Sequence, residues 1–415
     1  MTDPSDGTID ASELPPDVNH GLATLAADLV RIPSENPPGN ERACATVVRD
    51  WLRERDVDAE LIETPDPERP QVAARVGSGD PVLVLNGHLD VVPVEAHDKW
   101  EQNPYAGSIN DGRLYGRGSA DMKTGVAIAM LLTAKLAPEL DAGALPGSVV
   151  FHAAMGEETA DPGTETLLER GYGGTFGIVL EPTEFRVATA AKGVAVYRVT
   201  VNGDGAHASH PEQGTNPVDG IRGVLNAVGN YDLRLRDRSE GLCGTPIASV
   251  TELDVGVGTN YGVIPERGRL LIDRRIVPGE AIGDVDNEIT RLLDEVESKS
   301  DTAIEWERIQ HYAAASIPTD HPVAGRLRTI SESRVDAPKK PWCIEAATDV
   351  RNFVNDAGIS AVTWGPGSLD RAHAIDESID LVDAHKGLGI LETFTREFLQ
   401  RRITLDGSSA EEYQA

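Results

Sequence analysis

Acidic and imidazole side chains recur along the chain at points where an apolar run gives way to a turn. They are His88, Asp90, Asp121, Glu157, Glu158, Glu181 and His373. An open α/β sheet binds ligands at the edge where the carboxyl ends of its strands meet. Carboxylate oxygens and imidazole nitrogens suit zinc, cobalt or manganese, and the sequence does not rank these metals. The series therefore predicts a hydrolytic site with two metal ions.

His88 and Asp90 lie two residues apart on chain expected to be extended. This spacing lets a carboxylate hold the ring nitrogen that a metal does not use, as metal-ligating histidines usually require. Alone, a histidine after a strand is also compatible with a hydrogen-bonded surface residue. Asp121 follows a glycine-containing segment and precedes a helical pattern, so it is either a helix N-cap or a carboxylate that bridges two cations.

Glu157 and Glu158 are adjacent acids directly after an apolar run. Their side chains diverge, so one can bind a metal while the other accepts a proton from the attacking water. In an acidic protein, such a pair can also be simply solvated.

Continuous apolar runs precede several of these acids and are typical of strands buried on both faces. The predicted strands are residues 81–86, 147–154, 176–180 and 359–364, and the predicted helices are residues 21–32, 41–55, 121–136, 164–169, 323–333 and 350–356. This alternation predicts an α/β domain whose strand ends carry the candidate ligands.

The middle of the chain has a different pattern, with the order β-α-β-β-α-β of a ferredoxin-like unit. Strands are expected at residues 192–202, 246–255, 269–277 and 303–312, with helices at 216–228 and 281–298. Because the α/β pattern then returns, we expect residues 191–313 to be inserted into a larger domain formed by residues 1–190 and 314–415. Residues 1–19 are expected to be a loose acidic lead.

The charge balance is strongly acidic, with 68 acidic and 38 basic residues and a formal net charge of -30. Such a surface repels nucleic acid and anionic membranes, so neither is expected as a partner. Only eight of the basic residues are lysines. Acid excess with few lysines favours a halophilic protein in a salt-rich cytoplasm, and an acidic mesophilic protein is the alternative.

The three cysteines are too few and too scattered to predict a disulfide framework or a cysteine metal site, which favours a reducing cytosol. The first residues show no basic start followed by an apolar core, and no apolar run reaches about 18 residues. We therefore expect a soluble cytoplasmic protein.

Several segments resemble the family of acetylornithine deacetylases, succinyl-diaminopimelate desuccinylases, aminoacylases and glutamate carboxypeptidases, over roughly residues 20–400. Residues 87–93 (GHLDVVP) resemble its first metal signature and residues 116–123 (GRGSADMK) its second. The resemblance implies a mixed-sheet zinc-peptidase catalytic domain with an inserted ferredoxin-like lid and dimerisation domain. Thr124, where the family often has Gly, and Ile375–Asp376 depart from its pattern and blur the substrate subgroup.

The resemblance also implies ligand roles. It implies that His88 and Glu181 complete one metal site, that Glu158 and His373 complete the other, and that Asp121 bridges both.

For the remaining acids, the resemblance implies that Glu157 is the general base and that Asp90 orients His88. It further implies a cis peptide bond after Asp121.

The inserted domain contains residues 205–211 (GAHASHP), which resemble the segment whose first histidine, here His207, reaches a partner subunit's active site and polarises the scissile carbonyl. Asn260 and Arg275 match substrate-binding positions, and an arginine fork suits a carboxylate. Strand alternation leaves open whether Arg274 or Arg275 faces outward. Gly367 belongs to a segment that resembles the loop near the substrate backbone.

These features predict a cytoplasmic, homodimeric metallohydrolase that removes an acyl group from an N-acyl amino acid, as in amino-acid biosynthesis. We expect two divalent ions, zinc foremost, and a small N-acyl amino acid or short peptide as substrate. A metallocarboxypeptidase or dipeptidase is the alternative within the family. A non-catalytic metal-binding or regulatory homologue, and acids that only solvate a halophile's surface, are the alternatives outside it.

Overall fold

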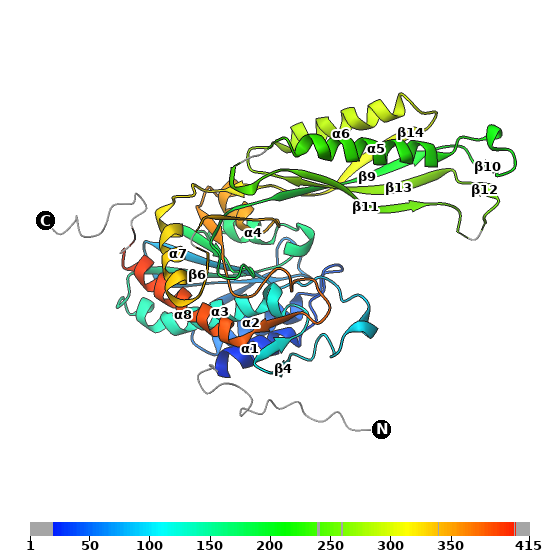
Figure 1. The fold of residues 1–415 in the computed structure, drawn as a ribbon. Helices are drawn as coiled ribbons and strands as arrows, with labels where there is room; N and C mark the ends of the chain where they lie inside the picture. Colours follow the sequence, from blue (N-terminus) through cyan, green and yellow to red (C-terminus); the bar gives the residue numbers. More distant parts are fainter. Residues whose placement is uncertain (1–19, 239–240, 259, 339, 402, 404–415) are drawn as a thin grey trace, which may run out of the picture. The chain divides into compact units, whose positions relative to one another are not determined.

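The structure is a computed structural model that describes residues 20–238, 241–258, 260–338, 340–401 and 403. The chain forms two compact units, shown with the rest of the fold in Figure 1. The first comprises Met1–Thr189, Ile317–Trp342 and Thr348–Ala415, and the second comprises Ala190–Ser316 and Cys343–Ala347. The acidic lead expected at residues 1–19 lies outside the described residues.

Parallel, fully buried strands form the centre of the sheet in the first unit. β3 (Val82–His88) lies between β6 (Gly147–Ala154) and β7 (Phe176–Val179), and β7 also pairs in parallel with β17 (Ala361–Thr363). Their side chains are mostly aliphatic, which suits a sheet covered on both faces. Because the strands are parallel, their carboxyl ends meet at one edge, as the apolar runs predict.

Antiparallel strands extend this sheet, so that it is mixed, as expected. β1 (Ala59–Ile62) and β2 (Gln71–Ser78), which the sequence patterns did not reveal, extend it beyond β6. The order is β1-β2-β6-β3-β7-β17-β8-β15, with β16 beside β8. The last three strands are β8 (Ala188–Ala191), β15 (Ala315–Ser316) and β16 (Trp342–Ile344).

The helices of the first unit are α1 (His20–Val30), α2 (Arg42–Arg53), α3 (Thr124–Asp141), α4 (Gly163–Glu169), α7 (Pro322–Arg334) and α8 (Leu381–Leu399). α3 packs against β2, β3 and β6 and also contacts α1 and α8. The helix predicted from residue 121 was placed too early, because Ser119–Lys123 forms an irregular turn, η2, and α3 begins after it. The helix expected at residues 350–356 contains the wide turn η6 (Asn352–Asp356).

A small antiparallel sheet in the same unit joins segments that are far apart in the sequence. Its strands are β4 (Ser108–Asn110), β5 (Arg113–Tyr115) and β18 (Ser378–Asp380), in the order β18-β5-β4. Ser378 pairs with Tyr115. The residues directly after β5 therefore lie beside the residues directly before β18.

The second unit has the ferredoxin-like arrangement that the sequence predicts. Its elements are β9 (Gly193–Asn202), α5 (Pro217–Leu235), β11 (Ile247–Val255), β13 (Arg267–Ile276), α6 (Ile282–Glu297) and β14 (Ala303–Tyr312). The strands form an antiparallel sheet in the order β11-β13-β9-β14, and α5 and α6 cover one face of it (Figure 1). β9 alternates buried and half-buried residues, as a strand with one covered face should.

The cysteine interpretation was wrong for two of the three residues. Cys243 and Cys343 form a disulfide with 5.1 Å between their Cα atoms, whereas Cys44 is free and buried. The two are separated by 100 positions and meet because residues 343–347 return to the second unit after the chain has re-entered the first. Spacing alone could not reveal a pairing that depends on this return.

No helix in the described part of the chain has both the length and the apolarity that crossing a membrane requires.

Candidate metal centre

The parallel strands bring candidate ligands to one edge of the first unit. His88 is the last residue of β3, and Glu181 lies two residues beyond β7. Glu157 and Glu158 begin the short turn η3 (Glu157–Thr159), which follows β6. Asp121 lies in the irregular turn η2, where the implied cis peptide bond after Asp121 is present.

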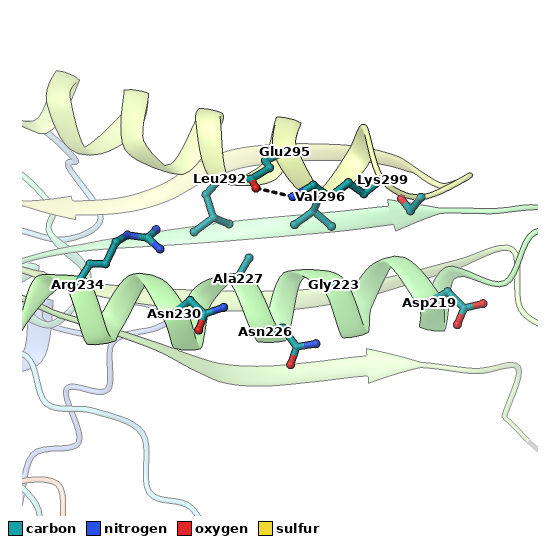
Figure 2. A pocket seen from close by; sticks show the side chains of 11 residues that line it. Asp219, Gly223, Asn226, Ala227, Asn230, Arg234, Leu292, Glu295, Val296 and Lys299 are labelled. Carbon is teal, nitrogen blue, oxygen red and sulfur yellow. Dashed lines mark hydrogen bonds and ion pairs between the residues drawn. The ribbon is translucent and has the colours of Figure 1, made fainter.

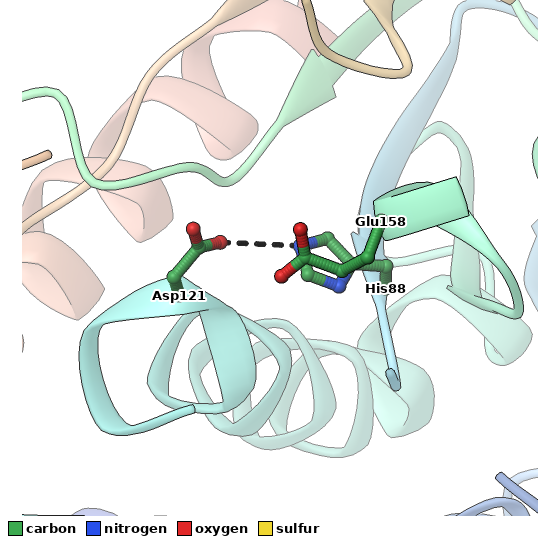
Figure 3. Close-up of side chains that lie close together, drawn as sticks. All are labelled: His88, Asp121 and Glu158. Carbon is green, nitrogen blue, oxygen red and sulfur yellow. Dashed lines mark hydrogen bonds and ion pairs between the residues drawn. The ribbon is translucent and has the colours of Figure 1, made fainter. Parts of the chain in front are cut away.

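His88, Asp121 and Glu158 offer ligand atoms that all lie within 4.8 Å of one another (Figure 3). His88 Nε2 lies 3.2 Å from Asp121 Oδ1 and 3.6 Å from Glu181 Oε1. His373 Nε2 lies 3.4 Å from Asp121 Oδ2 and 3.2 Å from Glu158 Oε1. Each oxygen of Asp121 therefore faces a different histidine, which is the geometry that a carboxylate bridging two ions requires.

The electrostatics of this cluster favour added positive charge. Burial, together with neighbouring carboxylates, raises the pKa of Glu158 and that of Glu181. Hydrogen bonding to Asp121 and Glu158 raises the pKa of His373 to about 10. Crowded buried carboxylates avoid ionisation unless a cation offsets their repulsion, and divalent ions do so while leaving the imidazoles neutral. The oxygen and nitrogen donors thus fit zinc, cobalt or manganese.

Asp90 faces His88 through both its backbone oxygen and its carboxylate. His88 Nδ1 is 2.9 Å from the backbone oxygen of Asp90 and 3.5 Å from its carboxylate. The carboxylate also accepts the backbone N–H groups of Glu157 and Glu158 at 3.2 and 3.0 Å, and the side-chain amide of Asn36 at 2.9 Å. Burial opposes its charge, but these contacts and His88 lower the pKa of Asp90. Asp90 therefore ties the end of β3 to the turn that carries both glutamates.

Glu157 is buried beside the cluster, and burial raises the pKa of its carboxyl group well above the usual range. Arg351 lies 3.8 Å from Glu157 and 3.5 Å from Asp349, which in turn accepts a hydrogen bond from Thr164 at 2.6 Å. Asp349 and Arg351 were not predicted from the sequence as site residues. Their sequence signal was weak: an acid and an arginine two residues apart, without a neighbouring metal signature.

A second missed pair, Arg117 and Glu377, connects two ligand-bearing segments. Glu377 is fully buried, accepts the backbone N–H groups of Ala120 and Asp121, and pairs with Arg117 at 2.7 Å. Their positions in the sequence could have suggested a role near the metal ligands. Glu377 lies four residues after His373, and Arg117 lies four residues before Asp121.

The remaining predicted site residues in the lid belong to the second unit. His207 is exposed in β10 (Ala206–His207), which pairs with β12 (Val263–Ile264), and its Nδ1 lies 2.6 Å from Ser209 Oγ. Asn260 is also exposed, shortly before β12. This ladder joins the segments that carry His207 and Asn260.

Burial shows which of the two neighbouring arginines, Arg274 or Arg275, faces outward. Arg274 is fully buried and bonds to Tyr231 and Glu280, whereas Arg275 is partly exposed and its guanidinium contacts Asp273. Gly367, in the first unit, has a φ of +86°, a conformation that glycine adopts without steric cost.

A hollow lies between α5 and α6, with a volume of about 300 Å³ (Figure 2). Its lining includes Asp219, Asn226, Arg234, Glu295 and Lys299. These side chains are mixed in charge, and the lining contains neither histidine nor cysteine. It therefore lacks the donor set of the first unit's cluster.

The catalytic and inserted units, together with the donor cluster, define a metallopeptidase fold. The profile of Peptidase family M20/M25/M40 matches residues 84–397, and the chain belongs to this family. It is a metal-dependent hydrolase that acts on linear amide or peptide bonds.

Two curated relatives are named succinyl-diaminopimelate desuccinylases. A probable succinyl-diaminopimelate desuccinylase of Staphylococcus epidermidis is 28% identical over 86% of this chain and 92% of the relative. A succinyl-diaminopimelate desuccinylase of Methylobacterium radiotolerans is 34% identical over 65% of this chain and 70% of the relative.

Solved structures share the fold at lower identity. An M20 family metallo-carboxypeptidase from Sulfolobus solfataricus is 18% identical, covers 92% of this chain and 100% of its own, and has a TM-score of 0.74. Human carnosine dipeptidase 1 is also 18% identical and has a TM-score of 0.72, with 91% of this chain and 96% of its own covered. A dinuclear metal-binding peptidase of the M20 family from Bacillus subtilis is 16% identical, covers 91% and 98%, and has a TM-score of 0.64.

Proposed function

We propose that this protein is a dinuclear metal-dependent amidohydrolase that removes the acyl group from an N-acyl amino acid. The observation that carries the proposal is the cluster around Asp121, whose two carboxylate oxygens face His88 and His373. Buried Glu157, the proposed base, stands in the turn that also carries Glu158. A solvated acidic surface does not explain why His88, Asp121 and Glu157 are buried.

Five side chains would hold the two ions. His88 and Glu181 would bind one ion, Glu158 and His373 the other, and Asp121 both. Zinc is the proposed physiological metal, with cobalt or manganese as alternatives. When bound, the ions supply Lewis-acid activation of water and of the amide carbonyl.

The chain's own residues would then handle the proton. Glu157 takes a proton from the attacking water and returns it to the leaving amine. The hydrogen bond from the Glu157 N–H to Asp90, and the nearby guanidinium of Arg351, support the position of this base. Asn260, Arg275 and the backbone around Gly367 would bind the substrate.

We propose N-succinyl-diaminopimelate as the leading substrate, with N-acetylornithine next, because the curated relatives carry the desuccinylase name. The test is a panel of N-acyl amino acids, dipeptides and carboxypeptidase substrates, assayed with zinc, cobalt or manganese at several salt concentrations. The proposal expects the highest kcat/KM for an N-acyl amino acid. Preference for a peptide would instead support the metallocarboxypeptidase or dipeptidase alternative, which the structural similarity to such enzymes favours.

Glu157→Gln separates catalysis from a metal-binding or regulatory role. General-base catalysis contributes roughly 10²–10⁴-fold, so kcat should fall by that factor while two ions remain bound. Glu169→Gln, at an exposed position of the same unit, is the matched control and should retain activity. Normal turnover in Glu157→Gln would show that another group is the base.

We also propose a homodimer joined through the lid domain, in which His207 of one subunit polarises the substrate carbonyl in the other. Complementation tests this arrangement: Glu157→Gln and His207→Ala are each weak alone, but a mixed dimer contains one site with both groups intact. Activity should therefore rise when the two variants are mixed and allowed to exchange subunits. No gain despite verified exchange would exclude action across the subunit boundary.

A cytoplasmic location and a salt-adapted surface complete the proposal. The excess of acidic residues and the low lysine content support salt adaptation. Given the Cys243–Cys343 disulfide, this location requires a cytoplasm in which the cysteine pair stays oxidised. Activity and folding measured across salt concentrations test the salt adaptation, and the thiol state of protein isolated from cells tests the compartment.

A further inference from the structure

The turn that presents Asp121 has little regular hydrogen bonding of its own. Asp121 and Met122 have non-helical backbone angles within η2, at φ -121°, ψ 96° and φ -133°, ψ 34°. A backbone in this state needs partners from outside the turn to hold its N–H groups. The carboxylate of Glu377 supplies them.

Glu377 lies at the centre of these contacts. Its Oε1 accepts the N–H groups of Ala120 and Asp121 at 2.8 and 3.0 Å. Its Oε2 accepts the N–H of Gly118 at 3.1 Å and the guanidinium of Arg117 at 2.7 Å. Consecutive N–H groups that converge in this way form an anion-binding nest, here filled by a side chain of the same protein.

Arg117 contacts the segment that carries His373, just as Glu377 contacts the segment that carries Asp121. Its guanidinium also reaches the backbone oxygens of His373 and Ala374, at 3.5 and 3.4 Å. His373 has a φ of +58°, which is uncommon for a residue with a side chain and needs support from its surroundings. The segment from Asp121 to Gly116 and the segment from His373 to Glu377 therefore hold each other.

The small antiparallel sheet aligns these two segments. Ser378 of β18 pairs with Tyr115 of β5, and the N–H of Gly116 donates to the backbone oxygen of Glu377 at 2.9 Å. The two chains thus leave the sheet side by side, one toward Asp121 and the other toward His373. Within the proposed site, Asp121 and His373 are ligands of the same ion.

We propose that Glu377 and Arg117 are positioning residues that hold Asp121 and His373 at the separation required to bind the second metal ion. This inference rests on the proposed function, since it assigns a role to two of its ligand segments. A merely structural role would lower stability and leave the ratio of bound ions unchanged. Positioning instead predicts that the ion shared by Asp121, Glu158 and His373 is lost first, because His373 would bind only that ion.

The test is cobalt binding to the metal-free full-length protein, followed by visible absorption and by equilibrium competition with a chelator. Wild-type protein should bind two equivalents in two spectroscopically distinct steps. Glu377→Gln should keep one tight step and weaken the other by about 10–100-fold, the usual effect of losing a group that orients a ligand. kcat should fall more than KM rises.

Two further variants make the outcome decisive. Arg117→Lys retains Glu377 and its backbone bonds but loses the planar fork, so it should weaken the same step by a smaller factor. Asp232→Asn is the matched control: Asp232 is a buried carboxylate in the second unit that accepts a backbone N–H from Ala248 and a guanidinium from Arg236. It should leave both cobalt steps intact.

Each result bears on one idea. Absence of cobalt binding in wild-type protein would overturn the proposed function itself. Two normal cobalt steps in both Glu377→Gln and Arg117→Lys, with the wild type binding two ions, would overturn only the positioning role. If Glu377→Gln fails to fold, Arg117→Lys decides, with thermal unfolding used to choose a temperature at which it is native.

Discussion

Asp90→Asn tests whether the turn carrying Glu157 and Glu158 is held by the strand that carries His88. Asp90 is fully buried, and its two oxygens accept backbone N–H groups from both glutamates. Asparagine has the same shape but replaces one acceptor with an NH₂ donor. Whichever way the amide is oriented, at least one backbone N–H will face a donor instead of an acceptor.

The magnitude follows from these bonds. A hydrogen bond to a charged group contributes about 1.5–3 kcal/mol, and an unsatisfied buried donor adds a cost of similar size. If Oδ2 is the atom replaced, the bonds from Glu158 and Asn36 are both lost, so we expect a loss of about 3–6 kcal/mol within the site. Groups that orient metal ligands typically affect affinity or activity by about 10–100-fold, and we expect kcat/KM and metal affinity to fall within that range.

The assay combines a chelator competition for cobalt with kcat and KM at saturating metal. Asn36→Ala is the graded comparison, because it removes one bond to Asp90 Oδ2 and leaves both glutamate N–H bonds in place. Its effect should be smaller than that of Asp90→Asn. If Asp90→Asn binds cobalt and turns over substrate like the wild type, the proposed coupling between β3 and this turn is wrong.

Two other predictions concern stability. His152 is fully buried and burial lowers its pKa to about 4, so the folded protein resists protonation that the unfolded chain accepts below about pH 6.5. This contribution to the free energy of unfolding should therefore be fully present above pH 6.5 and fall by about 3 kcal/mol as the pH drops to 4. In denaturation measured over this pH range, His152→Gln should show a smaller dependence of stability on pH. If the pH dependence of the variant equals that of the wild type, His152 is not its source. Replacing Cys243 and Cys343 by serine removes a covalent link between residues 100 positions apart and should destabilise the second unit by about 2–4 kcal/mol. Calorimetry should show a lower transition temperature for this variant. Wild-type protein with the disulfide reduced should show the same decrease. A transition identical to that of the oxidised wild type would contradict this.

For the candidate site, the sequence predicted the residues that directly follow buried strands. His88, Glu157 and Glu181 follow apolar runs, and parallel pairing of β3, β6 and β7 brings such ends to one edge. The ferredoxin-like order of the second unit was predictable for the same reason, since each strand and helix has its own periodicity. The hydrophobic periodicity of a segment was sufficient to predict a helix or strand that does not depend on a distant partner.

Prediction failed where the determinant was a partner distant in the sequence. The helix assigned from Asp121 begins later because Glu377 binds the N–H groups of the preceding turn. β1 and β2 were not predicted, because the burial of their side chains depends on a neighbouring strand, β6. Cys243 and Cys343 meet only because the chain returns to the second unit.

Asp90 and Glu377 share a property that explains why their backbone contacts were not predicted from the sequence. Both are fully buried carboxylates whose shortest contacts are with backbone N–H groups or amide and guanidinium donors. A backbone N–H exists at nearly every residue, so it leaves no compositional signal for the acid that binds it. The cost of burying such a charge is offset only when several donors converge on it. A buried acid with two or more backbone donors beside a ligand cluster is therefore evidence that the fold holds ligand segments in place, which the donor residues' identities cannot reveal.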